Sequence, residues 1–212
     1  MSHLPINHSD DPIRLFKSDI MEFFTHISPV VVLIIWLPVV IGFLLRAVLA
    51  HSGLNIPFYI PAGFFWGMFL WTFAEYTLHR FVFHFKPRHP RQEQVIFLFH
   101  GVHHAQPQCK TRLVMPPAVS IPLALFFYGL FDWVVGILLG APHWVDPLVA
   151  GFATGYLLYD LTHYATHHFP MRWGWPKYLK RYHMQHHYKT PDARFGVSSP
   201  IWDVLFRTFP EK

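Results

Sequence analysis

The chain has 212 residues, a length that suits one domain, and 52% of them are hydrophobic whereas only 14% are charged. That composition is too apolar for an ordinary soluble fold and indicates a membrane protein. The formal net charge is +5, but no basic stretch interleaved with aromatic residues resembles a nucleic-acid module, so we expect no nucleic acid among the partners.

The first half of the chain predicts a membrane hairpin. Residues 27–45 carry no charge and match the roughly 20 residues that cross the hydrocarbon layer as a helix. A second span is expected over about 56–78, after a turn rich in Gly, Asn and Pro. Residues 1–26 would then form a cytoplasmic N-terminal segment, and residues 27–212 would form a single domain.

The second half predicts two further spans less clearly. Span three is expected over about 119–139, where prolines precede the apolar run and an acidic residue interrupts it. The uncharged residues 147–159 would measure about 20 Å as a helix, which is shorter than the ~30 Å hydrocarbon layer. We therefore expect span four over about 145–162, continuing past Asp160 and carrying the next histidines out of the bilayer. The alternative is a re-entrant hairpin over residues 116–160.

Basic residues predict the orientation, because Lys and Arg accumulate on the cytoplasmic side of a membrane protein. Residues 1–26 contain two of them, residues 79–112 six and residues 163–212 eight. The turn between spans one and two contains one basic residue, and the turn between spans three and four contains none. With four spans, all three segments and the histidines in them would face the cytoplasm. We expect the endoplasmic reticulum membrane in a eukaryote and the inner membrane in a bacterium.

Histidine is the unusual feature of the composition, because eleven of the seventeen lie in four short clusters. The clusters are His79 and His84; His100, His103 and His104; His163, His167 and His168; and His183, His186 and His187. Residues three or four apart on a helix lie on one face, so we expect His100, His103 and His104 to converge on one point, as should His163 with His167, and His183 with His186 and His187. This is the spacing of metal ligands. His79 and His84 are about 140° apart on an ideal helix, so we expect them to straddle the end of span two rather than share a face. His168 is about 100° from His167 and is left outside the ligand set.

The ten remaining histidines of the clusters exceed the four ligands of a structural zinc, so the sequence predicts two metal ions with about five imidazoles each. Imidazole suits zinc, copper, iron or nickel. An open, nitrogen-rich bimetallic site beside lipid favours iron and the activation of dioxygen, although zinc fits the same ligands. No Ser-His-Asp arrangement or nucleotide-binding motif occurs, so electrons must come from an external donor. The other histidines are expected at the surface or in interfaces: His3, His8, His26, His51, His89 and His143.

The clusters reproduce the HxxxxH, HxxHH, HxxxH and HxxHH boxes of a known superfamily. Together with the segments "FAEYTLHRFVFH", "RLVMPP", "GYLLYDLTHY" and "FGVSSPIWDVLFRTF", they resemble the fatty acid 2-hydroxylase branch of the fatty acid hydroxylase and sterol desaturase superfamily. The resemblance covers about residues 15–209. It implies an all-α integral membrane fold of four transmembrane helices, under a cytoplasmic helical cap that holds a dinuclear histidine-ligated site.

The resemblance also implies dioxygen-dependent hydroxylation at carbon 2 of a lipid acyl chain, free or in ceramide, as in sphingolipid metabolism. Many fungal and animal members carry an N-terminal cytochrome b5 domain that this sequence lacks, so we expect an external electron donor of the cytochrome b5 or ferredoxin type in trans. The boxes alone are shared with sterol and carotenoid hydroxylases and acyl desaturases, which are the alternative enzymes. A metal carrier or transporter is the alternative of another class, although its ligands would lie near the middle of the membrane.

Metal-bound histidines usually have a carboxylate or carbonyl partner on the second ring nitrogen. The candidates for that role are Asp160, Tyr156, Tyr159 and Glu75. Asp160 and Tyr159 lie about one helical turn before His163, Glu75 lies one turn before His79, and Tyr156 lies one turn before Asp160. The alternative is an interfacial tyrosine belt with a snorkelling carboxylate. Packing of the cap is the expected role of three residues in the family segments, Arg112, Trp202 and Asp203.

Overall fold

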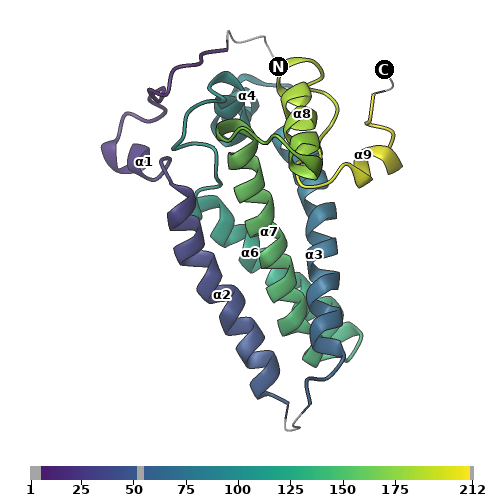
Figure 1. Ribbon diagram of the computed structural model, residues 1–212. Helices are drawn as coiled ribbons and strands as arrows, with labels where there is room; N and C mark the ends of the chain where they lie inside the picture. The colour runs from purple at the N-terminus through teal and green to yellow at the C-terminus, as the bar shows by residue number, and fades with distance from the viewer. Residues whose placement is uncertain (1–5, 52–54, 211–212) are drawn as a thin grey trace. The chain divides into compact units, whose positions relative to one another are not determined.

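The computed structural model describes residues 6–51 and 55–210, and within these ranges the fold is helical with no β-strand (Figure 1). The predicted all-α class is therefore confirmed for the described residues. His3 and part of the first predicted turn lie outside them. The α-helices are α1 (Asp19–Phe23), α2 (Pro29–Leu49), α3 (Tyr59–Thr77), α4 (Pro90–Ile96), α5 (Val102–Ala105), α6 (Pro117–Phe131), α7 (Val145–His168), α8 (Gly174–Tyr188) and α9 (Ile201–Leu205). Single π-helical turns cover Leu78–Phe83, Phe97–Gly101 and Asp132–Leu138, and a 3₁₀ turn covers Pro142–Trp144.

The chain divides into two compact units, and the division falls inside α3 and α7. The bundle unit comprises Pro29–Trp71 and Met115–Leu158. The histidine unit comprises Met1–Ser28, Thr72–Val114 and Tyr159–Lys212. Neither unit is one continuous stretch, so the N-terminal segment clusters with residues that follow it by more than forty positions.

Two helices of the bundle unit are long and apolar enough to cross a membrane. They are α2, with a mean hydropathy of 2.6, and α6 with its π-helical turn (Pro117–Leu138), with a mean hydropathy of 1.9. Only 22% and 0% of their most apolar windows are buried, so these side chains are not the core of a soluble domain. The two helices therefore indicate a membrane protein. Predicted spans two and four correspond to α3 and α7, which do not reach the same hydropathy, and their crossing of the membrane stays a prediction.

In the bundle unit, α3 and α7 approach each other through glycines. A Cβ atom on Gly67 would lie 2.1 Å from the Leu148 carbonyl oxygen, and one on Gly151 would lie 1.8 Å from the Phe64 carbonyl oxygen. Gly63 and Gly67, like Gly151 and Gly155, are four residues apart. This spacing of small residues is typical of membrane helices whose backbones come into contact. The pairs of glycines are visible in the sequence and could have predicted this contact.

We expect Gly151→Ala to destabilise the bundle by about 1–3 kcal/mol, because the added methyl group overpacks a backbone contact. Gly42→Ala is the matched control, since a Cβ at Gly42 meets no atom within 4 Å and alanine favours the helix. Thermal unfolding of both purified variants in detergent measures the difference. Equal unfolding temperatures for the two variants would contradict the glycine-mediated contact.

Candidate metal centre

Ten histidines of the histidine unit lie in two groups of five, and within each group the facing ring nitrogens lie within 4.8 Å of one another. Group A comprises His79, His84, His100, His104 and His186, and group B comprises His103, His163, His167, His183 and His187. Nine of the ten are buried, and His104 is half-buried. These are the ten histidines that their spacing marked as ligands. His168 lies outside both groups, with its ring against Tyr164.

His79 and His84 share group A because the helix changes its pitch between them. After α3 ends at Thr77, the π-helical turn Leu78–Phe83 follows, and the His84 N–H donates to the His79 carbonyl at 3.0 Å. An i→i+5 hydrogen bond places residues five apart one above the other. Their ring centroids are accordingly 4.9 Å apart. The expectation that these two residues do not share a face was wrong, because it assumed an ideal α-helix.

The other boxes divide between the groups according to helical spacing. Residues four apart stay together: His100 and His104 in group A, and His163 with His167 and His183 with His187 in group B. The middle histidine of each HxxHH box points to the other group, so His103 joins group B and His186 joins group A. The expectation that all three histidines of such a box converge on one point was therefore wrong. Two boxes thus each contribute to both groups, and this ties the two groups into one centre.

The spacing between ring nitrogens suits metal coordination. Neighbouring Nε2 atoms lie 3.0–3.1 Å apart in group A and 2.9–3.0 Å apart in group B. With metal–nitrogen bonds of ~2.1 Å, ligands at right angles would be ~3.0 Å apart and tetrahedral ligands ~3.4 Å apart. The spacing between neighbouring Nε2 atoms therefore fits a five- or six-coordinate ion better than a tetrahedral one.

Burial keeps these imidazoles neutral. Burial is the main cause that lowers the pKa of all ten below the ordinary value of histidine. It lowers the pKa of His163 to about 3 and that of His186 to about 4. Neutral imidazole is the form that binds metals, and each group aims five such nitrogens at one buried point. The residues present therefore fit one metal ion in each group.

The second ring nitrogens differ between the groups. In group A, the Nδ1 of His79 donates to the Phe195 carbonyl at 2.5 Å and that of His186 donates to the Ala193 carbonyl at 2.7 Å. A donating Nδ1 leaves Nε2 as the metal-binding atom and fixes the plane of the ring. In group B, the described residues offer no hydrogen-bond partner to the Nδ1 atoms of His103, His167, His183 and His187.

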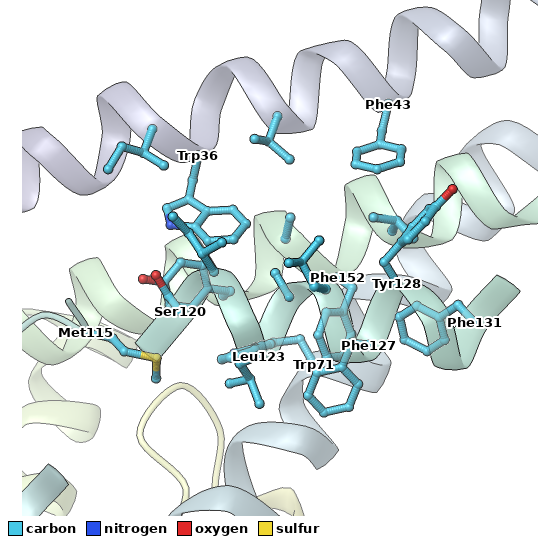
Figure 2. A pocket seen from close by; sticks show the side chains of 18 of the residues that line it. Trp36, Phe43, Trp71, Met115, Ser120, Leu123, Phe127, Tyr128, Phe131 and Phe152 are labelled. Carbon is cyan, nitrogen blue, oxygen red and sulfur yellow. The ribbon is translucent and has the colours of Figure 1, made fainter. Parts of the chain in front are cut away.

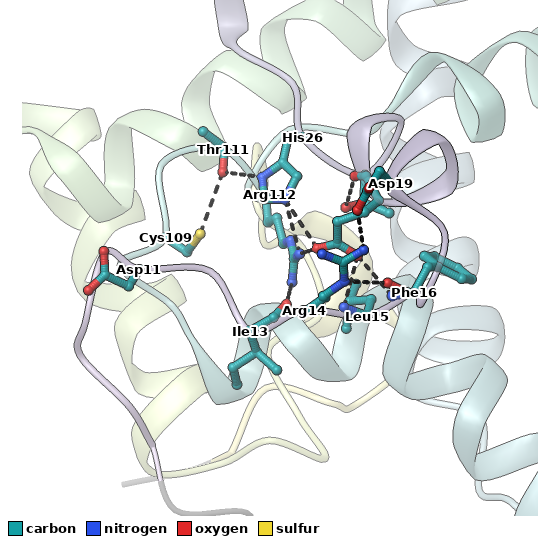
Figure 3. A network of polar contacts seen from close by, with 12 residues as sticks. Asp11, Ile13, Arg14, Leu15, Phe16, Asp19, His26, Cys109, Thr111 and Arg112 are labelled. Carbon is teal, nitrogen blue, oxygen red and sulfur yellow. Dashed lines mark hydrogen bonds and ion pairs between the residues drawn. The ribbon is translucent and has the colours of Figure 1, made fainter.

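The N-terminal segment holds the chain that follows the second box (Figure 3). Arg112, a buried residue for which only packing was expected, donates to the Ile13 carbonyl and to the Glu22 carboxylate. Gln106 accepts from the Ile13 N–H at 2.8 Å and donates to the Asp11 carbonyl at 2.9 Å. Residues 11–22 thus fix residues 106–112, directly after the ligands of α5. No local pattern in the sequence predicts these hydrogen bonds, because their partners are about ninety residues apart in the chain.

Of the four candidate partners, Glu75 is bound to the backbone rather than to a histidine: it accepts hydrogen bonds from the N–H groups of Val197 and Ser198. Asp160 is 1% exposed, which disagrees with a carboxylate that snorkels to water. The Tyr159 ring stacks on His163 with 5.9 Å between centroids, whereas Tyr156 contacts Trp rings of the bundle unit. A role for any of the four in orienting a metal ligand stays a prediction.

Comparison with known proteins places this centre in a family. The family model described as fatty acid hydroxylase matches residues 64–208, which include all ten histidines of the two groups. The chain belongs to the fatty acid hydroxylase family. The family resemblance expected from the boxes is thereby confirmed.

Relatives within the family are hydroxylases of lipid acyl chains by name. The chain is 38% identical to dihydroceramide fatty acyl 2-hydroxylase FAH1 of Arabidopsis thaliana over 208 residues, covering 98% of this chain and 84% of that protein. It is 41% identical to ceramide very long chain fatty acid hydroxylase scs7 of Schizosaccharomyces pombe over 183 residues, covering 82% and 49%. The solved structure described as full length scs7p, with only the hydroxylase domain visible, superposes with a TM-score of 0.81 at 36% identity, covering 91% of this chain and 70% of that one.

The bundle unit of this fatty acid hydroxylase contains a cavity of about 480 Å³ with an almost entirely apolar wall (Figure 2). Trp36 of α2, Phe127 of α6 and Phe152 of α7 line it. The Ser120 hydroxyl is buried in the wall and has no hydrogen-bond partner among the described residues. A cavity of this size and lining suits an apolar ligand that carries few polar groups.

Removal of one imidazole should weaken metal binding in its own group only. The variants are His84→Ala in group A and His167→Ala in group B. We expect each to retain about one metal ion per chain where the wild type retains two, because all five ligands of the unchanged group remain. Metal analysis after gel filtration in the presence of a weak chelator measures this. His168→Ala is the control and should retain both ions. Full metal content in both ligand variants would contradict the assignment.

Proposed function

We propose that this protein hydroxylates carbon 2 of a lipid acyl chain, since the names of relatives such as FAH1 of Arabidopsis thaliana describe those proteins as 2-hydroxylases. The observation that carries the proposal is the pair of five-histidine groups in a chain of this family. The reaction inserts one atom of dioxygen into a C–H bond. Two electrons and two protons reduce the other atom to water, and an electron donor supplies the two electrons. We propose a donor of the cytochrome b5 or ferredoxin type in trans.

We propose that groups A and B each hold one iron ion. When bound, the pair of iron ions supplies the reduction of dioxygen and the oxidation of the C–H bond. Zinc fits the same nitrogens but has no redox chemistry, so it would occupy the site without supporting hydroxylation. The chain contributes ten neutral imidazoles, burial that excludes bulk water, and five ligands per group, which leave a sixth position for an exchangeable ligand.

The proposed topology has four membrane spans with the histidine-bearing segments on the cytoplasmic side. The distribution of basic residues supports it, since fourteen of the seventeen lie in residues 79–112 and 163–212. In this arrangement residues 27–212 act as one hydroxylase domain. Labelling of a cysteine placed at Lys177 from the cytoplasmic side tests the orientation, and labelling from the opposite side overturns it.

The function is tested by the lipid profile of cells that express the protein. We expect fatty acids released from the total lipid to gain one oxygen, and fragmentation to place it on carbon 2. His103→Ala should abolish this product, because it removes a ligand of group B, whereas His168→Ala should leave it in place. Oxygen on an isoprenoid, or acyl chains that lose two hydrogens instead, would favour a sterol or carotenoid hydroxylase or a desaturase and contradict the proposal.

We also propose that the cavity of the bundle unit takes an apolar lipid chain. Ala124 lines the cavity, so Ala124→Phe would fill part of its volume. We expect this variant to shift the 2-hydroxylated products toward shorter chains, without loss of bound metal. Ala118→Phe is the matched control, because Ala118 is exposed and does not line the cavity. An unchanged chain-length distribution in Ala124→Phe would show that the cavity does not select the substrate.

A further inference from the structure

One loop, residues 193–198, provides the partners that orient two ligands of group A. The Ala193 carbonyl accepts the hydrogen bond of His186, and the Phe195 carbonyl accepts that of His79. His79 belongs to the π-helical turn after α3 and His186 belongs to α8, more than one hundred residues later. The position of this loop therefore determines the ring planes of two ligands that arrive from separate helices.

Two buried carboxylates hold the loop. Asp203 of α9 is 0% exposed and accepts from the Phe195 N–H at 2.9 Å and from the Gly196 N–H at 2.7 Å. Glu75 of α3 is 3% exposed and accepts from the Val197 N–H at 2.5 Å and from the Ser198 N–H at 2.8 Å. Four consecutive N–H groups thus end on two carboxylates. Such charge-assisted hydrogen bonds are stronger than those between neutral groups.

A single peptide group connects Asp203 to His79 by one hydrogen bond at each of its ends. The peptide bond between Phe195 and Gly196 donates its N–H to Asp203 and accepts the His79 Nδ1–H on its carbonyl. A carboxylate at the N–H end increases the negative charge on the carbonyl, because hydrogen bonds in a chain polarise one another. A stronger acceptor at Nδ1 raises the ability of Nε2 to donate to a metal. The arrangement is a carboxylate–histidine–metal relay with a peptide group inserted.

The loop leaves no room for a side chain at Gly196. A Cβ on Gly196 would lie 2.0 Å from the Ser199 carbonyl oxygen and 3.0 Å from Asp203 Oδ2. Asp203 also accepts from the Thr208 hydroxyl at 2.7 Å, and Arg194 donates its N–H to the Thr208 carbonyl at 3.0 Å. The carboxylate of Asp203 therefore stands at the centre of the loop and of the chain end that packs on it.

We propose that Asp203 and Glu75 are positioning residues of the group A metal and act through the loop 193–198. The inference rests on the proposed metal binding by the two groups. It predicts a selective effect, since the Nδ1 atoms of four group B histidines have no hydrogen-bond partner among the described residues, this loop included. Loss of the carboxylates should weaken the group A site and leave the group B site unchanged.

The test uses the full chain, purified in detergent, with Zn²⁺ as the probe in equilibrium competition against a chelator. Wild type should bind two ions per chain. In Asp203→Asn the amide group cannot accept from both N–H groups, and we expect the affinity of one site to fall about 10 to 100-fold while the other keeps its wild-type value. Both N–H groups donate to one oxygen of Glu75, which a glutamine would retain, so Glu75→Ala is the second variant and should weaken the same single site. Glu93→Gln, an exposed carboxylate change on α4, is the matched control and should leave both sites unchanged.

A second readout identifies which site is affected. We expect His84→Ala combined with Asp203→Asn to bind no less metal than His84→Ala alone, because both changes act on group A. His167→Ala combined with Asp203→Asn should lose both ions. Retention of the group B ion by Asp203→Asn also shows that the variant folds. Equal weakening of both sites, or of neither, overturns the inference, whereas a wild type that binds no metal overturns the proposed function itself.

Discussion

The fold of the histidine unit is arranged around ten imidazole nitrogens that are buried and aimed at two points. Buried polar atoms without partners are costly, since an unsatisfied group loses its hydration and gains nothing in return. Protonation does not relieve this cost, because burial lowers the pKa of every one of these rings. A metal ion at each point would satisfy five lone pairs at once. Metal binding and folding of this unit are therefore expected to be coupled.

The ligands reach their positions through three different kinds of local structure. Regular α-helix aligns His163 with His167 on α7. A π-helical turn aligns His79 with His84, which an α-helix would separate. Irregular chain supplies the rest of the support, from the loop 193–198 on one side and the N-terminal segment 11–22 on the other. These two irregular segments are held by buried carboxylates and by the side chains of Arg112 and Gln106, as a site that must hold its ligands to a fraction of an ångström requires.

Sequence patterns predicted the features that depend on short-range spacing. The helical class and the family followed from hydropathy, the boxes and their flanking segments, and both are confirmed. The division of the ten histidines between two groups could not be predicted, because it depends on which helix faces which. The π-helical turn was missed because a spacing of five was measured on an ideal helix. The carboxylates of Asp203 and Glu75 act over 7 to 123 residues of sequence, and only the fold shows that they meet the same loop. The glycine pairs of α3 and α7 could have been found from their spacing.

We expect each group of five histidines to hold one metal ion in a five- or six-coordinate shell of nitrogen atoms or of nitrogen and oxygen atoms. X-ray absorption spectroscopy of the purified, metal-loaded wild type measures that shell directly. The account predicts five or six nitrogen or oxygen atoms at ~2.1 Å around each metal, with the multiple-scattering signature of several imidazoles and with two metals per chain. A tetrahedral four-atom shell, or one with only one or two imidazoles, would contradict it.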